Sequence, residues 1–171
     1  MIKITFKKDK MGDIKNDVLK MVITKNHPIN NISYNLTPCS SHEWDLPYSA
    51  NHHCITRNAN NYAVAQAKIN IDDWIKIQAS AIGMSNDVEK FLQGAYDNTK
   101  ERVEEDIKNN NTSGIPAPVL ELKPNKWPKQ LEDGDTVIYE PRQEGRSRAL
   151  GAKNAGLEWL PIWVAVRRIR R

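Results

Sequence analysis

A short run of carboxylate, glycine and arginine residues carries the clearest chemistry in this sequence. It reads Glu144-Gly145-Arg146-Ser147-Arg148, and residues that favour helix follow it. A glycine turn at the start of a helix leaves backbone N–H groups free at the positive end of the helix dipole. With two arginines beside those groups, the run predicts a binding site for a phosphate. The alternative for both arginines is a set of ordinary surface ion pairs, which contribute little.

Glu144, directly before the glycine, is the candidate catalytic residue of this run. A carboxylate at this place could hold a Mg²⁺ ion bound to the phosphates, or act as a general base. The alternative is a carboxylate at the end of a strand that pairs with Arg142 or Arg146.

The elements around this run are predicted to be a strand, a glycine turn, a short helix and a second strand. Residues 136–139 and 160–166 are rich in the β-branched and aromatic residues typical of strands. Gly156 stands where a glycine commonly ends a helix. Apolar spacing elsewhere predicts strands at 1–8, 32–36, 63–71 and 115–122, helices at 13–24 and 72–82, and one long helix that begins at Asn86 and runs for five turns or more. Its prolines restrict the segment 115–122 to an edge strand or to the start of a strand.

Several parts of the second half of the chain follow one another in a recognisable order and spacing. They are an acidic amphipathic helix, Gly114-Ile115-x-x-Pro118, Glu144-Gly145-Arg146-Ser147-Arg148, Ala155-Gly156-Leu157 and Leu160-Pro161. With these parts the chain resembles the N-terminal domain of ParB, in the wider ParB/sulfiredoxin superfamily, over residues 68–166. The resemblance implies a mixed α/β domain over residues 67–171, with a small mixed sheet and flanking helices, preceded by an N-terminal α/β extension over residues 1–66 of unassigned role.

Members of this superfamily bind nucleotide phosphates, so the resemblance implies a nucleotide- and DNA-associated protein. The kind implied is a nuclease or NTPase that uses a nucleoside triphosphate with Mg²⁺. Two alternatives are a non-catalytic DNA-binding or regulatory module with the same fold, and a small-molecule kinase. A homodimer would be compatible with each of them. The phosphate contacts would come from Gly145, Arg146, Ser147 and Arg148, and a loop closing over the nucleotide from Gly114, Ile115 and Pro118.

The charge distribution points to the same class of partner. Residues 112–171 hold 11 Lys/Arg and 7 Asp/Glu, so this part alone accounts for the net charge of +4. A basic end beside a phosphate-like turn suits a nucleotide or nucleic-acid partner. The candidate DNA contacts are Arg167, Arg168, Arg170 and Arg171. The alternative is a solvated tail that aids solubility.

A cluster of cysteine and histidine residues lies in the irregular segment 37–61. Cys39, His42, His53 and Cys54 are ligand types that zinc prefers, and we consider them a candidate structural zinc site. The alternative is an irregular loop whose cysteines are simply buried.

The chain has no segment that predicts membrane insertion or export. No apolar run approaches the roughly 20 residues that span a bilayer, and the N-terminus lacks the apolar core of a signal peptide. Two cysteines do not make a disulfide framework. We therefore expect a cytoplasmic protein with no membrane partner.

Overall fold

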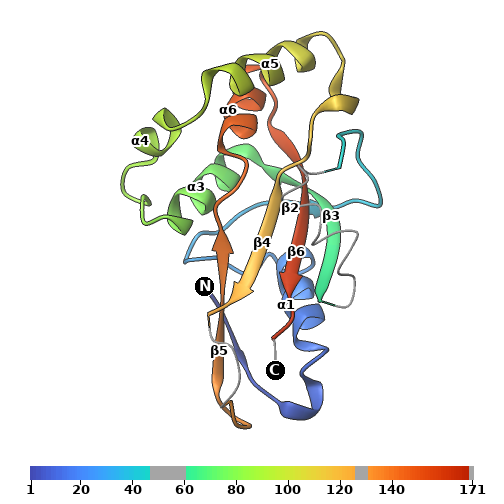
Figure 1. Ribbon diagram of the computed structural model, residues 1–171, viewed down its shortest axis with the longest axis vertical. Coiled ribbons are helices and arrows are strands. Elements are labelled where there is room, and N and C mark those ends of the chain that lie inside the picture. The colour runs from blue at the N-terminus through green and yellow to red at the C-terminus, as the bar shows by residue number, and fades with distance from the viewer. Residues whose placement is uncertain (47–60, 126–130, 170–171) are drawn as a thin grey trace.

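The computed structural model describes residues 1–46, 61–125 and 131–169. In these ranges the chain is a mixed α/β protein built on a six-stranded sheet with the order β1-β5-β4-β6-β3-β2 (Figure 1). Neighbouring strands are antiparallel except for β4 and β6, which are parallel. The strands are β1 Ile2–Thr5, β2 Leu36–Pro38, β3 Tyr62–Asn70, β4 Val119–Pro124, β5 Thr136–Arg142 and β6 Trp159–Arg167.

Helices gather mainly at one end of this sheet, where α4, α5 and α6 lie together, whereas α1 lies toward the end that holds the C-terminus (Figure 1). In the described ranges, every helix is too short or too polar to cross a bilayer. The helices are α1 Ile14–Ile23, α3 Ile71–Ala81, α4 Val88–Gln93, α5 Asp97–Lys108 and α6 Arg146–Asn154, with single 3-10 turns at Lys8–Lys10 and Thr112–Gly114.

The predicted succession of strand, glycine turn, short helix and strand is confirmed by β5, α6 and β6. Gly145 opens α6 with a φ of +81°, and Gly156 follows its end with a φ of +90°. Both angles lie in the left-handed region, which glycine enters without the penalty that a Cβ would bring. The sequence signals at both ends of α6 were therefore genuine helix boundaries.

Strand β4 lies between β5 and β6, in the interior of the sheet, so of the two predicted alternatives the edge strand does not apply. Pro116 and Pro118 both precede its first residue, Val119. The ladder thus loses no N–H donor to these prolines, and a proline just before a strand is compatible with a central position. The structure keeps the other part of that prediction, since the prolines stand at the start of the strand.

The predicted long helix is two helices. Asp87 is the N-cap of α4, where its side chain accepts a hydrogen bond from the Lys90 N–H, so the predicted cap at Asn86 is displaced by one residue. Gly94 ends α4, and Tyr96 is the N-cap of α5. A glycine inside a helical pattern costs about 1 kcal/mol relative to alanine, and here the helix stops at it.

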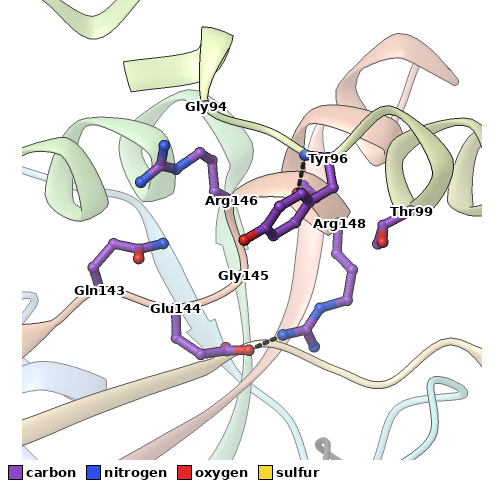
Figure 2. A pocket seen from close by; sticks show the side chains of 9 residues that line it. Gly94, Tyr96, Thr99, Gln143, Glu144, Gly145, Arg146 and Arg148 are labelled. Carbon is purple, nitrogen blue, oxygen red and sulfur yellow. Dashed lines mark hydrogen bonds and ion pairs between the residues drawn. The ribbon is translucent and has the colours of Figure 1, made fainter. Parts of the chain in front are cut away.

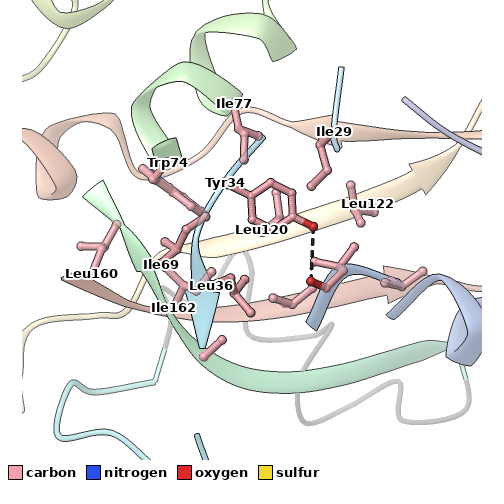
Figure 3. Close-up of a cluster of buried hydrophobic side chains, with 14 of the residues drawn as sticks. Ile29, Tyr34, Leu36, Ile69, Trp74, Ile77, Leu120, Leu122, Leu160 and Ile162 are labelled. Carbon is pink, nitrogen blue, oxygen red and sulfur yellow. Dashed lines mark hydrogen bonds between the residues drawn. The ribbon is translucent and has the colours of Figure 1, made fainter. Parts of the chain in front are cut away.

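One apolar core joins segments that are far apart in the sequence. Figure 3 shows side chains from β2, β3, α3, β4 and β6 meeting together with Ile29 and Tyr34. Trp74 and Ile77 on α3 have no exposed surface. The hydroxyl of Tyr34 donates to the Val22 carbonyl at 3.3 Å, which satisfies its polar end inside the core.

The N-terminal segments share the sheet with the rest of the chain. Strands β1 and β2 form its two edges, β1 beside β5 and β2 beside β3. Strand β3 itself runs across the boundary predicted at residues 66 and 67. The division into an extension and a ParB-like domain stays a prediction, as does the ParB-like version of the fold.

Candidate functional site

The turn between β5 and α6 is tightly packed as well as left-handed. An added Cβ at Gly145 would lie 2.7 Å from the Cβ of Pro118, closer than such atoms approach in proteins. Glycine is thus required here by both backbone angle and space. The packing fixes where α6 starts relative to the loop before β4.

The first backbone N–H groups of α6 have no hydrogen-bond acceptor among the described residues. The first helical bond runs from the Ala149 N–H to the Gly145 carbonyl at 3.1 Å, and no side chain caps the helix. Within the described residues, the N–H groups of Gly145, Arg146 and Ser147 donate to no protein acceptor. Unbonded N–H groups at the positive end of a nine-residue helix form a favourable environment for an anion.

Arg148 points toward Glu144 and forms an ion pair with it (Figure 2). The Arg148 side chain is only 4% exposed and that of Glu144 15%. Arg148 also donates from Nη1 to the Pro116 carbonyl at 2.6 Å. The cation therefore ties the turn to the loop before β4.

Glu144 is engaged at three of its groups. Its Oε1 pairs with Arg148, its Oε2 accepts from the Val119 N–H at 2.7 Å, and its own N–H donates to Gln78 Oε1 at 2.7 Å. As a Mg²⁺ ligand or a general base, the carboxylate would have to give up one of these contacts. A catalytic role for Glu144 stays a prediction.

Of the two arginines of the turn, Arg146 is the one that pairs with no carboxylate among the described residues. Its guanidinium lies 4.4 Å from the ring centroid of Phe91 on α4, in a cation–π contact. A Cβ added at Gly94 would overlap the guanidinium, so Gly94 provides the space that Arg146 occupies. The side chain is half-buried, and its charge remains available at the mouth of the opening.

Ser147 joins the start of α6 to the start of α5. Its buried Oγ accepts a hydrogen bond from the Tyr96 N–H at 2.8 Å. Tyr96 is the N-cap of α5, and this helix also begins without a side-chain cap. Two uncapped helix starts are thereby held side by side, which adds their dipoles at one place.

A cavity of about 510 Å³ lies where these two helices begin. This volume falls within the ~300–1,000 Å³ of typical ligand sites. Figure 2 shows Arg146 and Arg148 leaving the turn in different directions, with the Tyr96 side chain between them. The lining residues are Gly94, Tyr96, Thr99, Gln143, Glu144, Gly145, Arg146, Ser147 and Arg148.

The cavity gathers all five residues of the predicted turn but not the predicted closing loop. Gly114 is exposed in a 3-10 turn, whereas Ile115 and Pro118 are buried. None of these three lines the cavity. Pro118 packs beneath Gly145 instead, so its contact is with the turn itself.

The predicted DNA contacts lie far from this cavity. Arg167 ends β6, at the opposite end of that strand from α6 (Figure 1), and its guanidinium is 6.0 Å from the Tyr62 ring centroid. Arg168 is exposed, and its N–H donates to the Asn61 carbonyl at 2.7 Å. Arg170 and Arg171 lie outside the described residues. The phosphate turn and the basic end are therefore two separate regions.

The structure describes two of the four residues of the predicted zinc site. Cys39 and His42 lie in the described segment after β2, whereas His53 and Cys54 fall outside the described residues. Burial raises the pKa of the Cys39 thiol and lowers the pKa of His42. In ranges 1–46, 61–125 and 131–169, no group of three or more His, Cys, Asp or Glu side chains could hold a metal ion.

Four cavity residues were absent from the sequence-based prediction. Tyr96 and Thr99 belong to the start of α5, about 50 positions upstream, and Gly94 lies just before it. Gln143 follows the last residue of β5. The one signal in the sequence is Gly94, since a glycine within a helical pattern suggests a break or a close approach. Nothing local to Tyr96 or Thr99 links either residue to the turn.

Comparison with known proteins adds no family to this description. No protein-family model, no curated protein and no solved structure matches the chain.

Proposed function

We propose that the protein binds a nucleotide by its phosphates at the start of α6, as a ParB-like, DNA-associated protein of the nuclease or NTPase kind. The observation that supports this most is the meeting of two uncapped helix starts in one cavity. Arg146 adds a positive charge that no described carboxylate neutralises. Free N–H groups and a guanidinium are the donors that phosphate oxygens require.

The residues of the turn have different roles in this proposal. Gly145 and the first N–H groups of α6 cradle the phosphate, and Arg146 turns from Phe91 to neutralise it. Arg148 and Glu144 hold the turn in shape through their buried pair. The contacts of Glu144 favour one alternative in particular, a binding or regulatory module that holds nucleotide without turnover.

Equilibrium binding of CTP, ATP and ADP, each with Mg²⁺, tests the phosphate site. Arg146→Gln removes the charge and keeps much of the side-chain length. We expect it to weaken binding about 10- to 100-fold, because a hydrogen bond to a charged group contributes roughly 1.5–3 kcal/mol. Arg168→Gln is the matched control, since Arg168 is an exposed arginine far from the cavity. The proposal fails if no nucleotide binds and Arg146→Gln changes nothing.

Turnover and DNA binding are measured on the same variants. Phosphate release from the bound triphosphate indicates an NTPase, and binding without release indicates the non-catalytic module. For DNA, the roles of the two variants reverse. Arg168→Gln should lower the salt dependence of DNA binding by about one phosphate contact, while Arg146→Gln should leave it unchanged. A DNA affinity that ignores both salt and Arg168 contradicts the DNA part of the proposal.

A further inference from the structure

Tyr96 is the most exposed large apolar side chain in the described part of the chain. It is 77% exposed, compared with 45% for Met1, the next highest. Figure 2 shows its ring reaching from the start of α5 across the cavity toward Gly145. An aromatic ring left this open at a cavity contributes little to folding, because burial is what makes aromatic side chains stabilising.

The backbone that carries this ring is firmly held. The Tyr96 N–H donates to the buried Ser147 Oγ at 2.8 Å, and the Tyr96 carbonyl accepts from the Lys100 N–H at 3.0 Å. The hydroxyl, in contrast, has no protein partner within the described residues. Tyr96 is thus an uncovered ring on a fixed base, directly beside the free N–H groups of α6.

From this arrangement we infer that Tyr96 is the stacking platform for the base of the bound nucleotide. The inference rests on the proposed function, and it identifies the ligand class as a nucleoside phosphate and not a sugar phosphate or a polyphosphate alone. The base would lie against the Tyr96 ring while the phosphates contact the start of α6. Stacking on an aromatic ring tolerates every base, because each base has a π face.

In this arrangement two polar side chains of the cavity are left to contact the ribose and the edges of the base. The Thr99 hydroxyl and the Gln143 amide both line the cavity. Neither makes a hydrogen bond to another described residue. The cavity therefore combines three kinds of group. Tyr96 provides an aromatic face, the start of α6 provides N–H groups and the charge of Arg146, and Thr99 and Gln143 provide neutral hydrogen-bonding groups.

Binding of ADP, CDP and inorganic pyrophosphate separates the base from the phosphates. Pyrophosphate shares the diphosphate and lacks the base. We expect Tyr96→Ala to weaken ADP and CDP by about 5- to 100-fold and to leave pyrophosphate unchanged, since stacking acts on the base alone. Tyr96→Phe keeps the ring and should retain wild-type affinity. Arg146→Gln should weaken all three ligands.

Three other results would contradict either the stacking role of Tyr96 or the phosphate site. If Tyr96→Ala leaves ADP and CDP unchanged while Arg146→Gln weakens them, the platform is wrong and the phosphate site stands. If Tyr96→Ala weakens pyrophosphate as much as ADP, the substitution has disturbed the start of α5, and the platform is again refuted. If none of the three ligands binds the wild-type protein, the proposed function itself fails. A urea unfolding curve for each variant confirms that the fold is intact.

Discussion

The buried pair between Glu144 and Arg148 gives the sharpest prediction about stability. Glu144→Gln keeps the shape of the side chain and removes its charge. Glu144 uses one oxygen for the Val119 N–H and the other for Arg148. In a glutamine one of these two positions becomes an NH2 group, which is a donor and cannot accept from either partner. The Arg148 side chain, which is only 4% exposed, then loses its counter-charge with little water around it to compensate.

The size of the effect follows from that burial. Breaking a buried ion pair from one side costs about 3–5 kcal/mol. We expect Glu144→Gln to fall near 3 kcal/mol, the lower end of that range, because the amide oxygen keeps one hydrogen bond. For a protein of this size 1 kcal/mol corresponds to about 2–4 °C, so the melting temperature should fall by roughly 6–12 °C.

Urea unfolding measures the loss, and an exposed pair of the same charge type provides the control. Glu104 pairs with Lys108 at 2.8 Å on α5, where the lysine side chain is 59% exposed. Glu104→Gln should cost about 0.5 kcal/mol or less. If Glu144→Gln costs no more than Glu104→Gln, the buried pair does not stabilise the turn. Glu144 would then be free for catalysis or metal binding, and the division of work proposed for the turn would be wrong.

Three further predictions concern a helix contact, the turn and one histidine. At Gly151 an added Cβ would lie 2.5 Å from the Lys100 carbonyl oxygen. Gly151→Ala should therefore destabilise the protein by about 1–2 kcal/mol in a urea unfolding curve, because this overpacking outweighs the gain in helix propensity. Gly145→Ala should cost about 1–3 kcal/mol and weaken ADP binding, because φ is +81° and Pro118 occupies the space. Burial holds the pKa of His42 below its ordinary 6.5, so the free energy of unfolding should fall as pH drops below 6.5, and His42→Phe should reduce that slope.

Each of these three has an outcome that contradicts it. A stabilised Gly151→Ala variant would mean that α5 and α6 separate without cost. Gly156→Ala is the control for the turn, since φ is +90° there and a Cβ would meet nothing within 4 Å. If it costs as much as Gly145→Ala, the contact with Pro118 contributes nothing. For His42, an unchanged pH slope in His42→Phe would show that another group causes the acid sensitivity.

Several elements of the fold follow from local sequence patterns. The alternating or β-branched runs became β3, β5 and β6, and the apolar stripe of α1 is buried at Ile14, Val18 and Val22. These signals are local, because side-chain periodicity and turn residues act within a few positions. The interior position of β4 could not be predicted from local patterns, because the place of a strand in the sheet depends on its partners, here β5 and β6.

The contacts of Arg146 and Arg148 could be predicted from the sequence only in part. Residues two positions apart on a helix do not face each other, so Arg146 and Arg148 had to point in different directions. Which of them is neutralised depends on Glu144 and on the Pro116 carbonyl, 32 positions away. Glu144 is four positions before Arg148, which is a local spacing, whereas the contact with Pro116 depends on the tertiary structure.

The sequence by itself determined the turn: Gly145 for its left-handed backbone, Arg146 and Arg148 for their charge, and Gly156 for the end of α6. Only the tertiary structure decided how these residues are used. Tyr96 reaches the turn across 51 positions of chain through Ser147, and this contact brings the start of α5 to the start of α6. The physical reason is that backbone angles are set by neighbours in sequence, whereas burial and charge pairing are set by whatever the packed core brings close.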